Sequence, residues 1–207
     1  MSAALPHDPA TPGQSPRRER LLLVALLLVA LLLRAARAGE GLPYLHHWDE
    51  PHTAGRALRM VTSGDFNPHW FHYGTATMYM NAAVDVLHYF WLCGQPEGAP
   101  ALARSLADIH TWPDDNWRYS ISHPSFYAWN RLLTALFGTG TVLLTWHIAR
   151  VLLGPLAAFL AAGLLAALPV HVAHSALVPT DVPVGCCVLT VIAATLDFVR
   201  SSRTSSR

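Results

Sequence analysis

Long apolar runs divide the chain and predict four membrane-crossing helices. The first run is Leu21–Leu33, which is purely apolar and which alanines extend as far as Ala38. The other three are Phe126–Ala149, Pro155–Val172 and Val182–Val199. A helix needs about 20 residues to cross the hydrocarbon core of a bilayer, and each run with its flanks approaches that length. We therefore expect an all-α polytopic membrane protein with about four spanning helices.

A fifth apolar stretch, Tyr73–Cys93, carries Asp85 and His88 in its middle. A carboxylate inside a bilayer is costly, and cytoplasmic loops are enriched in Lys and Arg. If this stretch does not cross, the arginines before the first run, Arg150 and the arginines after the last run all lie on the cytoplasmic side. If it crosses, Arg150 and the last arginines move outside. We therefore predict a juxtamembrane or re-entrant helix on the outer face.

This topology predicts a definite order of segments with a cytoplasmic N-terminus. Arg34 and Arg37, at the end of the first run, are expected to extend toward the membrane interface. The predicted segments are a cytoplasmic tail (1–20), a first transmembrane helix (21–38), a large outer loop with juxtamembrane helices (39–125), three further transmembrane helices with a short outer loop at 171–181 (126–200), and a cytoplasmic tail (201–207). An alternative is a secretory signal peptide that is cleaved after Ala38; residues from 39 onward are exported in both cases.

Composition agrees with a membrane protein and excludes other classes. Of the 207 residues, 52% are hydrophobic and 13% are charged, whereas roughly a quarter of a soluble protein is charged. A single soluble domain and a wholly disordered chain are both unlikely on these values. The net charge of +1 indicates no nucleic-acid partner. The twelve histidines are in excess, and ten of them, all but His7 and His147, fall in the predicted outer segments.

The first outer loop opens with an acidic pair, Asp49 and Glu50, followed by Pro51. Apolar residues then recur at helical spacing until Ser63 and Gly64, which predicts an amphipathic helix of about three turns, too short to span and suited to the interface. The simplest interpretation of Asp49 is a helix N-cap. A second interpretation is a zinc or manganese site formed by the acids with nearby histidines (His46, His47 and His52), although no established metal-binding spacing is present.

The second outer loop contains Asp181, a carboxylate at the mouth of an otherwise apolar helix. Such an acid is a functional hypothesis by default, and it also suits an N-cap for the fourth span. By the topology above, Asp181 lies on the same face of the membrane as Asp49 and Glu50.

Three stretches together resemble a known family. They are Asp49-Glu50-Pro51 with the run Arg56–Pro68, then Asn130-Arg131-Leu132 leading to Ala149-Arg150 and Gly154, and last His174-Ser175 with Thr180-Asp181-Val182-Pro183. Their order and spacing over roughly residues 40–200 resemble the polyprenyl-phosphate-sugar-dependent glycosyltransferases of the GT-C fold, family 39, which include protein O-mannosyltransferases. The resemblance implies a GT-C-like N-terminal transmembrane module in the plasma (inner) membrane.

The resemblance also implies a site and a mechanism. It implies a sugar donor on a polyprenyl phosphate, a hydroxyl acceptor on a protein, lipid or glycan, and a single inverting displacement. Asp49 is then the general base and Glu50 orients it or the acceptor. Asp181 is expected to hold a divalent cation (Mg²⁺ or Mn²⁺), with Asp49 or Glu50, or to place the donor phosphate. The expected donor-binding residues are Arg56, Arg59, His72, Tyr73 and His174, with Arg131 as a further arginine suited to phosphate.

Two departures qualify the resemblance. Gly74 stands where family members commonly have proline, and residues 94–124 resemble an insertion. Because family members have several hundred residues, we expect this chain to be an N-terminal fragment or a truncated product. The alternative function is a non-catalytic membrane protein, a transporter half or an assembly subunit, in which Asp49 and Asp181 are only helix caps.

Overall fold

The computed structural model describes residues 16–45, 47–94 and 123–205, and the regular elements in these ranges are α-helices. The stretch 94–124, predicted to be an insertion, and His46 of the predicted histidine cluster lie largely or wholly outside the described residues. The helices are α1 (Pro16–Ala35), α2 (Asp49–Ser63), α3 (Thr75–Cys93), α5 (Pro124–Leu153), α6 (Pro155–Ala167), α7 (Pro169–Ser175) and α8 (Asp181–Ser205).

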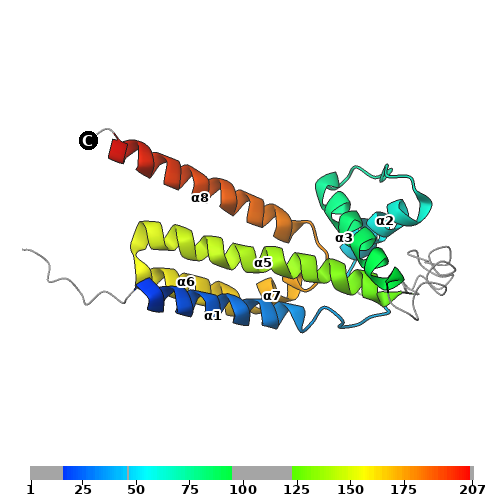
Figure 1. Ribbon diagram of the computed structural model, residues 1–207, viewed down its shortest axis with the longest axis horizontal. Coiled ribbons are helices and arrows are strands. Elements are labelled where there is room, and N and C mark those ends of the chain that lie inside the picture. Colours follow the sequence, from blue (N-terminus) through cyan, green and yellow to red (C-terminus); the bar gives the residue numbers. More distant parts are fainter. Residues whose placement is uncertain (1–15, 46, 95–122, 206–207) are drawn as a thin grey trace, which may run out of the picture.

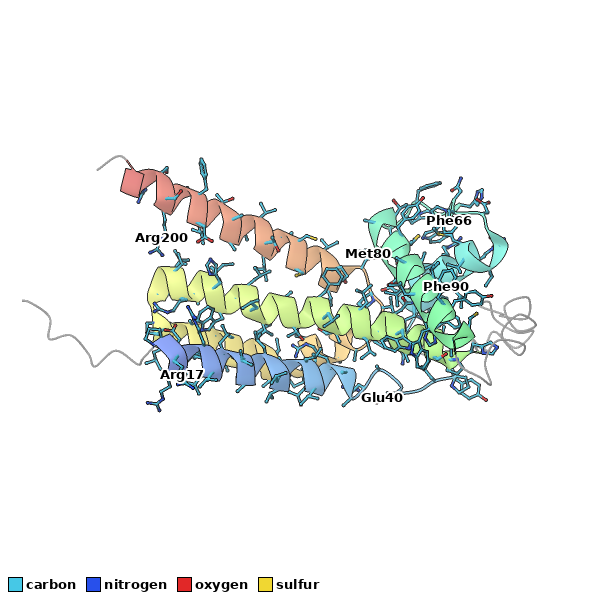
Figure 2. The ribbon with its side chains drawn as sticks, viewed as in Figure 1. Arg17, Glu40, Phe66, Met80, Phe90 and Arg200 are labelled. Atoms are coloured by element: carbon cyan, nitrogen blue, oxygen red, sulfur yellow. The ribbon has the colours of Figure 1, made fainter. Side chains whose placement is uncertain are left out.

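Four of these elements run lengthwise. Helices α1, α5 and α6 lie side by side, whereas α8 contacts α5 and diverges from it toward the C-terminus (Figure 1). Helices α2 and α3 pack against each other and against the beginning of α5, at one end of the bundle. Figure 2 shows Glu40, Phe66 and Phe90 toward this end, with Arg17 and Arg200 at the opposite end. The described polar residues of the predicted outer loops therefore gather at one end of the bundle.

Two helices, α5 and α8, are long and apolar enough to cross a membrane. The pair α6 and α7 passes the same test together, so the described part of the chain has two such spans, or three if the bent pair is one span. Helix α1 contains the apolar run Leu21–Leu33 and ends at Ala35, before the predicted end of the first span. It packs along α5 and α6, but charged residues at both of its ends keep it outside this group. The structure supports a helical membrane protein, and a span in α1 stays a prediction.

The third predicted span is divided into two helices by a bend. Helices α6 and α7 meet at a bend of 61°. Pro169 has no N–H to donate and its ring would clash with the carbonyl of Leu165. Leu168, the residue before this proline, is accordingly extended (φ −63°, ψ 114°). The predicted run continued through the proline because its residues are apolar on both sides.

Arg34 also differs from its prediction. Its side chain is completely buried rather than extended to the interface. Its guanidinium donates to the carbonyls of Leu165 and Ala166 at the end of α6, at 3.5 and 3.4 Å; the Leu165 carbonyl also accepts from the Leu168 N–H at 3.4 Å. A cation at a helix C-terminus is favourable because the carbonyl ends carry partial negative charge. Arg34 thus caps α6 from α1, whereas Arg37 is exposed and pairs with Glu40.

The prediction for α2 is confirmed. The helix begins at Asp49 and ends at Ser63, and Gly64 takes the left-handed conformation (φ +71°) that ends many helices. Its apolar face is buried, with Leu58 packed in a core cluster that includes Phe126 and Tyr127 of α5. Asp49 is not the N-cap, because Trp48 occupies that position and Asp49 is the first helical residue. The carboxylate of Asp49 is engaged elsewhere.

Candidate functional site

The acidic pair at the start of α2 divides into one buried and one partly open carboxylate. Glu50 is fully buried. Its Oε1 accepts from Arg131 Nε at 2.7 Å and from the backbone N–H of Val178 at 3.2 Å, and its Oε2 accepts from Arg131 Nη2 at 2.8 Å. Glu50 therefore ties α2 to α5 and to the loop before α8.

Arg131 joins further segments to this pair. Its Nη1 donates to the carbonyls of Ala38 and Glu40, at 3.0 and 2.7 Å, so it also anchors the segment after α1. The guanidinium is 2% exposed. Arg131, which the sequence suggested as a phosphate partner, is committed to holding four segments of the chain together. Glu50 likewise bonds to Arg131 and to the backbone of Val178. Because Glu50 is the neighbour of Asp49, these bonds fix the position of the start of α2.

Asp49 has about a third of its side chain exposed. Tyr73 OH donates to its Oδ1 at 2.7 Å, and its backbone N–H donates to His47 Nδ1 at 3.3 Å. The carboxylate raises the pKa of Tyr73, first through this hydrogen bond and then through its charge, and the charge of Asp181 adds to the effect. Tyr73 therefore lies within the electrostatic reach of both carboxylates, Asp49 and Asp181.

A stacked cluster adjoins Asp49 along α2. The ring of His52 stacks on Trp70, with centroids 4.8 Å apart, and the Arg56 guanidinium lies 4.4 Å from the Trp70 ring centroid. His72 packs against the same indole, with centroids 4.4 Å apart. Arg56 also donates to the carbonyl of Pro68 at 3.3 Å. Burial, followed by the charge of Arg56, lowers the pKa of His52.

The remaining predicted residues occupy different places. His174 is exposed, and its ring centroid lies 6.0 Å from that of His47. Asp181 is the exposed first residue of α8. Arg59 is exposed and lines, with Arg56 and Asp65 among others, a polar pocket of about 190 Å³. The fold therefore brings Asp49, Tyr73, His174 and Asp181 toward one end of the bundle, whereas Glu50 is buried beneath it and Arg59 faces another pocket.

An apolar groove of about 660 Å³ runs between α6–α7 and α8, with Thr141 of α5 in its lining. Its polar lining residues include His171, His174 and Asp181, and its remaining walls are mostly leucine and valine. Asp181 and His174 therefore connect this groove to the polar end of the bundle. The groove has the chemistry of a site for an amphiphile with a long apolar tail.

Sequence reasoning missed the contact of Arg34 with His171. Arg34 Nη2 lies 2.7 Å from His171 Nδ1, and His171 Nε2 lies 3.0 Å from Thr141 Oγ1. A guanidinium only donates, so Nδ1 is the acceptor and His171 is the neutral tautomer with its proton on Nε2. This fixes the imidazole that lines the groove. An arginine within a long apolar run was the available signal, because a buried charge needs partners.

The predicted cation sites at the histidine–acid cluster and at Asp181 stay predictions. Both oxygens of Glu50 are engaged, and the described ranges contain no group of three or more His, Cys, Asp or Glu side chains arranged to hold a metal ion. A site that includes Asp181 and Asp49 stays a prediction.

Comparison with known proteins supports one family. Residues 126–206 match the family model described as dolichyl-phosphate-mannose-protein mannosyltransferase. The matched stretch runs from α5 through α8 and includes Asn130, Arg131 and Asp181, but not Asp49. No curated protein and no solved structure gives a significant match. The match supports a membrane glycosyltransferase of the GT-C type and, with the apolar helices, an integral membrane protein.

Proposed function

We propose that this chain forms the site of a membrane glycosyltransferase that transfers a sugar from a polyprenyl-phosphate-linked donor to a hydroxyl acceptor at the outer face of the plasma (inner) membrane. The observation that carries the proposal is the placement of Asp49. A partly open carboxylate, oriented by Tyr73, stands at a bundle end that also presents His174 and Asp181 beside an apolar groove. The family match over residues 126–206 supports the same reaction class.

In this proposal Asp49 acts as general base. It removes the proton of the acceptor hydroxyl while that oxygen bonds to the anomeric carbon of the sugar, and the lipid phosphate leaves with the electron pair of the broken C–O bond. Tyr73 donates to Oδ1, which fixes the carboxylate plane. A positioned base typically contributes a factor of about 10²–10⁴ to the rate. Inversion at the anomeric carbon follows from the single displacement.

The donor is proposed to lie along the groove. Its apolar chain packs on the leucine and valine walls between α6–α7 and α8, and its phosphate lies toward His174 and Asp181. Tyr73 is proposed to contact the sugar or phosphate because it bonds directly to Asp49. His72 and Arg56 are proposed to do so because both pack on Trp70 in the adjoining cluster. Arg59 is proposed as a more distant donor-binding residue, since it lines, together with Arg56, a polar pocket apart from the groove. The acceptor, on a protein, lipid or glycan, approaches Asp49 from the solvent side.

Glu50 is proposed as a positioning residue, because its bonds with Arg131 and Val178 set the location of the neighbouring carboxylate. A divalent cation between Asp181 and Asp49 remains proposed, and the steps above do not require it. When bound there, Mg²⁺ or Mn²⁺ would neutralise charge on the leaving phosphate.

The test is sugar transfer from a polyprenyl-phosphate donor in membranes that contain this chain. Asp49→Asn should lower the turnover about 10²–10⁴-fold, and Tyr73→Phe roughly 10–100-fold, since one hydrogen bond to a charged group is lost. Asp197→Asn is the matched control, because Asp197 pairs with His147 between α5 and α8 and should leave turnover unchanged. Equal turnover of the wild-type and Asp49→Asn chains would refute the assignment of the base.

A further inference from the structure

Four buried polar side chains meet between α3 and α5, apart from the proposed site. Asp85 and His88 lie three residues apart on α3, and Tyr127 and Asn130 lie three residues apart on α5. All four are at most 5% exposed. Residues three apart share one face of a helix, so each pair faces the other helix. Nothing in the proposed transfer reaction uses these groups.

The hydrogen bonds of this cluster are incomplete in a specific way. Asn130 Nδ2 donates to Asp85 Oδ1 at 2.8 Å. Asp85 Oδ2 and Asn130 Oδ1 are buried and have no hydrogen-bond partner within the described ranges, and the same holds for His88 Nδ1 and Tyr127 OH. An ionised carboxylate and an amide oxygen are both acceptors only, so neither can satisfy the other. A single proton on Asp85 Oδ2 would make this oxygen a donor. Its acceptor would be Asn130 Oδ1, which belongs to the same amide whose Nδ2 already donates to Asp85 Oδ1.

We propose that Asp85 carries its proton in the folded protein and donates it to Asn130 Oδ1, so that the carboxyl and the carboxamide form a reciprocal pair that joins α3 to α5. One bound proton then satisfies both buried oxygens. Buried side-chain oxygens almost always have a hydrogen-bond partner. A neutral Asp85 also avoids placing an unpaired charge between two helices.

The surroundings of Asp85 support the neutral form. Burial raises the pKa of Asp85 well above its ordinary value of 3.8, against the opposing effect of the Asn130 bond. Burial also lowers the pKa of His88 below 6.5, so this imidazole is neutral at pH 7 and supplies no positive charge. His88 Nε2 lies 3.0 Å from Ser125 Oγ. The titratable group of α5 that faces Asp85 is Tyr127. The next charged groups are Glu50 and Arg131, which pair with each other.

Two neighbouring residues of α5 thus hold two acids in opposite states. Arg131 holds the ionised Glu50 of α2, and Asn130 holds the neutral Asp85 of α3. The joint between α3 and α5 is therefore sensitive to rising pH, because loss of the Asp85 proton removes one hydrogen bond and leaves a buried charge. This proton site is independent of the proposed transfer reaction.

The test compares Asp85→Asn with Asp85→Ala in the whole chain, by unfolding in detergent as a function of pH. The wild-type protein should lose stability as pH rises above 3.8, because the folded state then retains about one more proton than the unfolded state. Asp85→Asn mimics the neutral acid, since its own amide can donate to Asn130. It should fold, lose this pH dependence and match or exceed wild-type stability at neutral pH. Asp85→Ala should be destabilised over the whole pH range.

A second measurement detects the proton directly. Infrared spectra of the wild-type protein at pH 7 should contain the C=O band of a protonated carboxyl, and Asp85→Asn should lack that band. Asp65→Asn, which alters an exposed aspartate, is the control and should retain it. The proposal is overturned if Asp85→Asn does not fold, if its stability keeps the wild-type pH slope, or if the band survives the substitution. Transfer activity is not the readout, so failure of the proposed function leaves this test intact.

Discussion

Arg131 donates a hydrogen bond to each carboxylate oxygen of Glu50, from Nε to Oε1 at 2.7 Å and from Nη2 to Oε2 at 2.8 Å. Both side chains are nearly or fully buried, at 2% and 0% exposure. The two residues are 81 positions apart in the chain, and their pairing places the start of α2 against the beginning of α5. The open carboxylate of Asp49 owes its location to this buried pair beneath it.

Breaking this pair should destabilise the fold. Arg131→Met or Glu50→Gln leaves one charge buried without its partner, a loss that typically costs about 3–5 kcal/mol. Unfolding of the whole chain in detergent measures the loss, and the double variant should lose less than the sum of the two single variants. Arg37→Gln, at the exposed Arg37–Glu40 pair, should leave the stability unchanged. A single variant as stable as wild type would show that the buried pair does not hold α2 in place.

Arg34 should determine the order of α7. Arg34→Met removes the guanidinium donors to the carbonyls at the end of α6 and to His171, and a buried acceptor that loses its donor costs about 1–3 kcal/mol. We expect lower stability and faster amide hydrogen exchange in α7, while Arg34→Lys, which keeps the charge, should restore part of both. Unchanged exchange in α7 of the Met variant would contradict the capping role.

The stacked cluster around Trp70 should be sensitive to acid. The pKa of His52 is lowered from its ordinary value of 6.5, mainly by burial, so the folded state prefers the neutral ring. Its contribution to stability is complete above pH 6.5 and is lost as pH falls below that value, because the unfolded chain binds a proton first. His52→Gln should flatten this part of the pH profile of unfolding. A slope that persists in the Gln variant would assign the dependence to another group.

The predicted topology places α2 and α7 outside and the end of α8 inside. The native cysteines (Cys93, Cys186 and Cys187) are first replaced by serine. In this background Ser63→Cys and His174→Cys should react with a membrane-impermeant maleimide on intact cells, and Ser201→Cys only after permeabilisation. The reason is that arginines mark the cytoplasmic side, and Arg17 and Arg200 lie at the end opposite Glu40 (Figure 2). Labelling of Ser63→Cys but not His174→Cys would mean that the number of crossings between them is odd.

Several elements were predictable because their signals are local. The apolar runs predict the long helices. The end of α2 at Ser63, before Gly64, was predicted to the residue. The bend between α6 and α7 was not predicted, although Pro169 is a local signal. Transmembrane helices tolerate proline, so a proline in an apolar run does not by itself tell a continuous span from a broken one. The acidic pair at residues 49 and 50 was correctly selected for attention, but its two members could not be told apart.

The sequence by itself determined that the chain is helical and apolar, which segments form the helices, and which acids interrupt the apolar pattern. Those properties depend on neighbours within a few turns. Tertiary structure alone decided that Glu50 pairs with Arg131, that Arg34 caps α6 and that Asn130 meets Asp85, leaving Asp49 partly open. Each of these assignments depends on burial and on partners 45 or more positions away. Burial and distant partners are not encoded in the local spacing of residues.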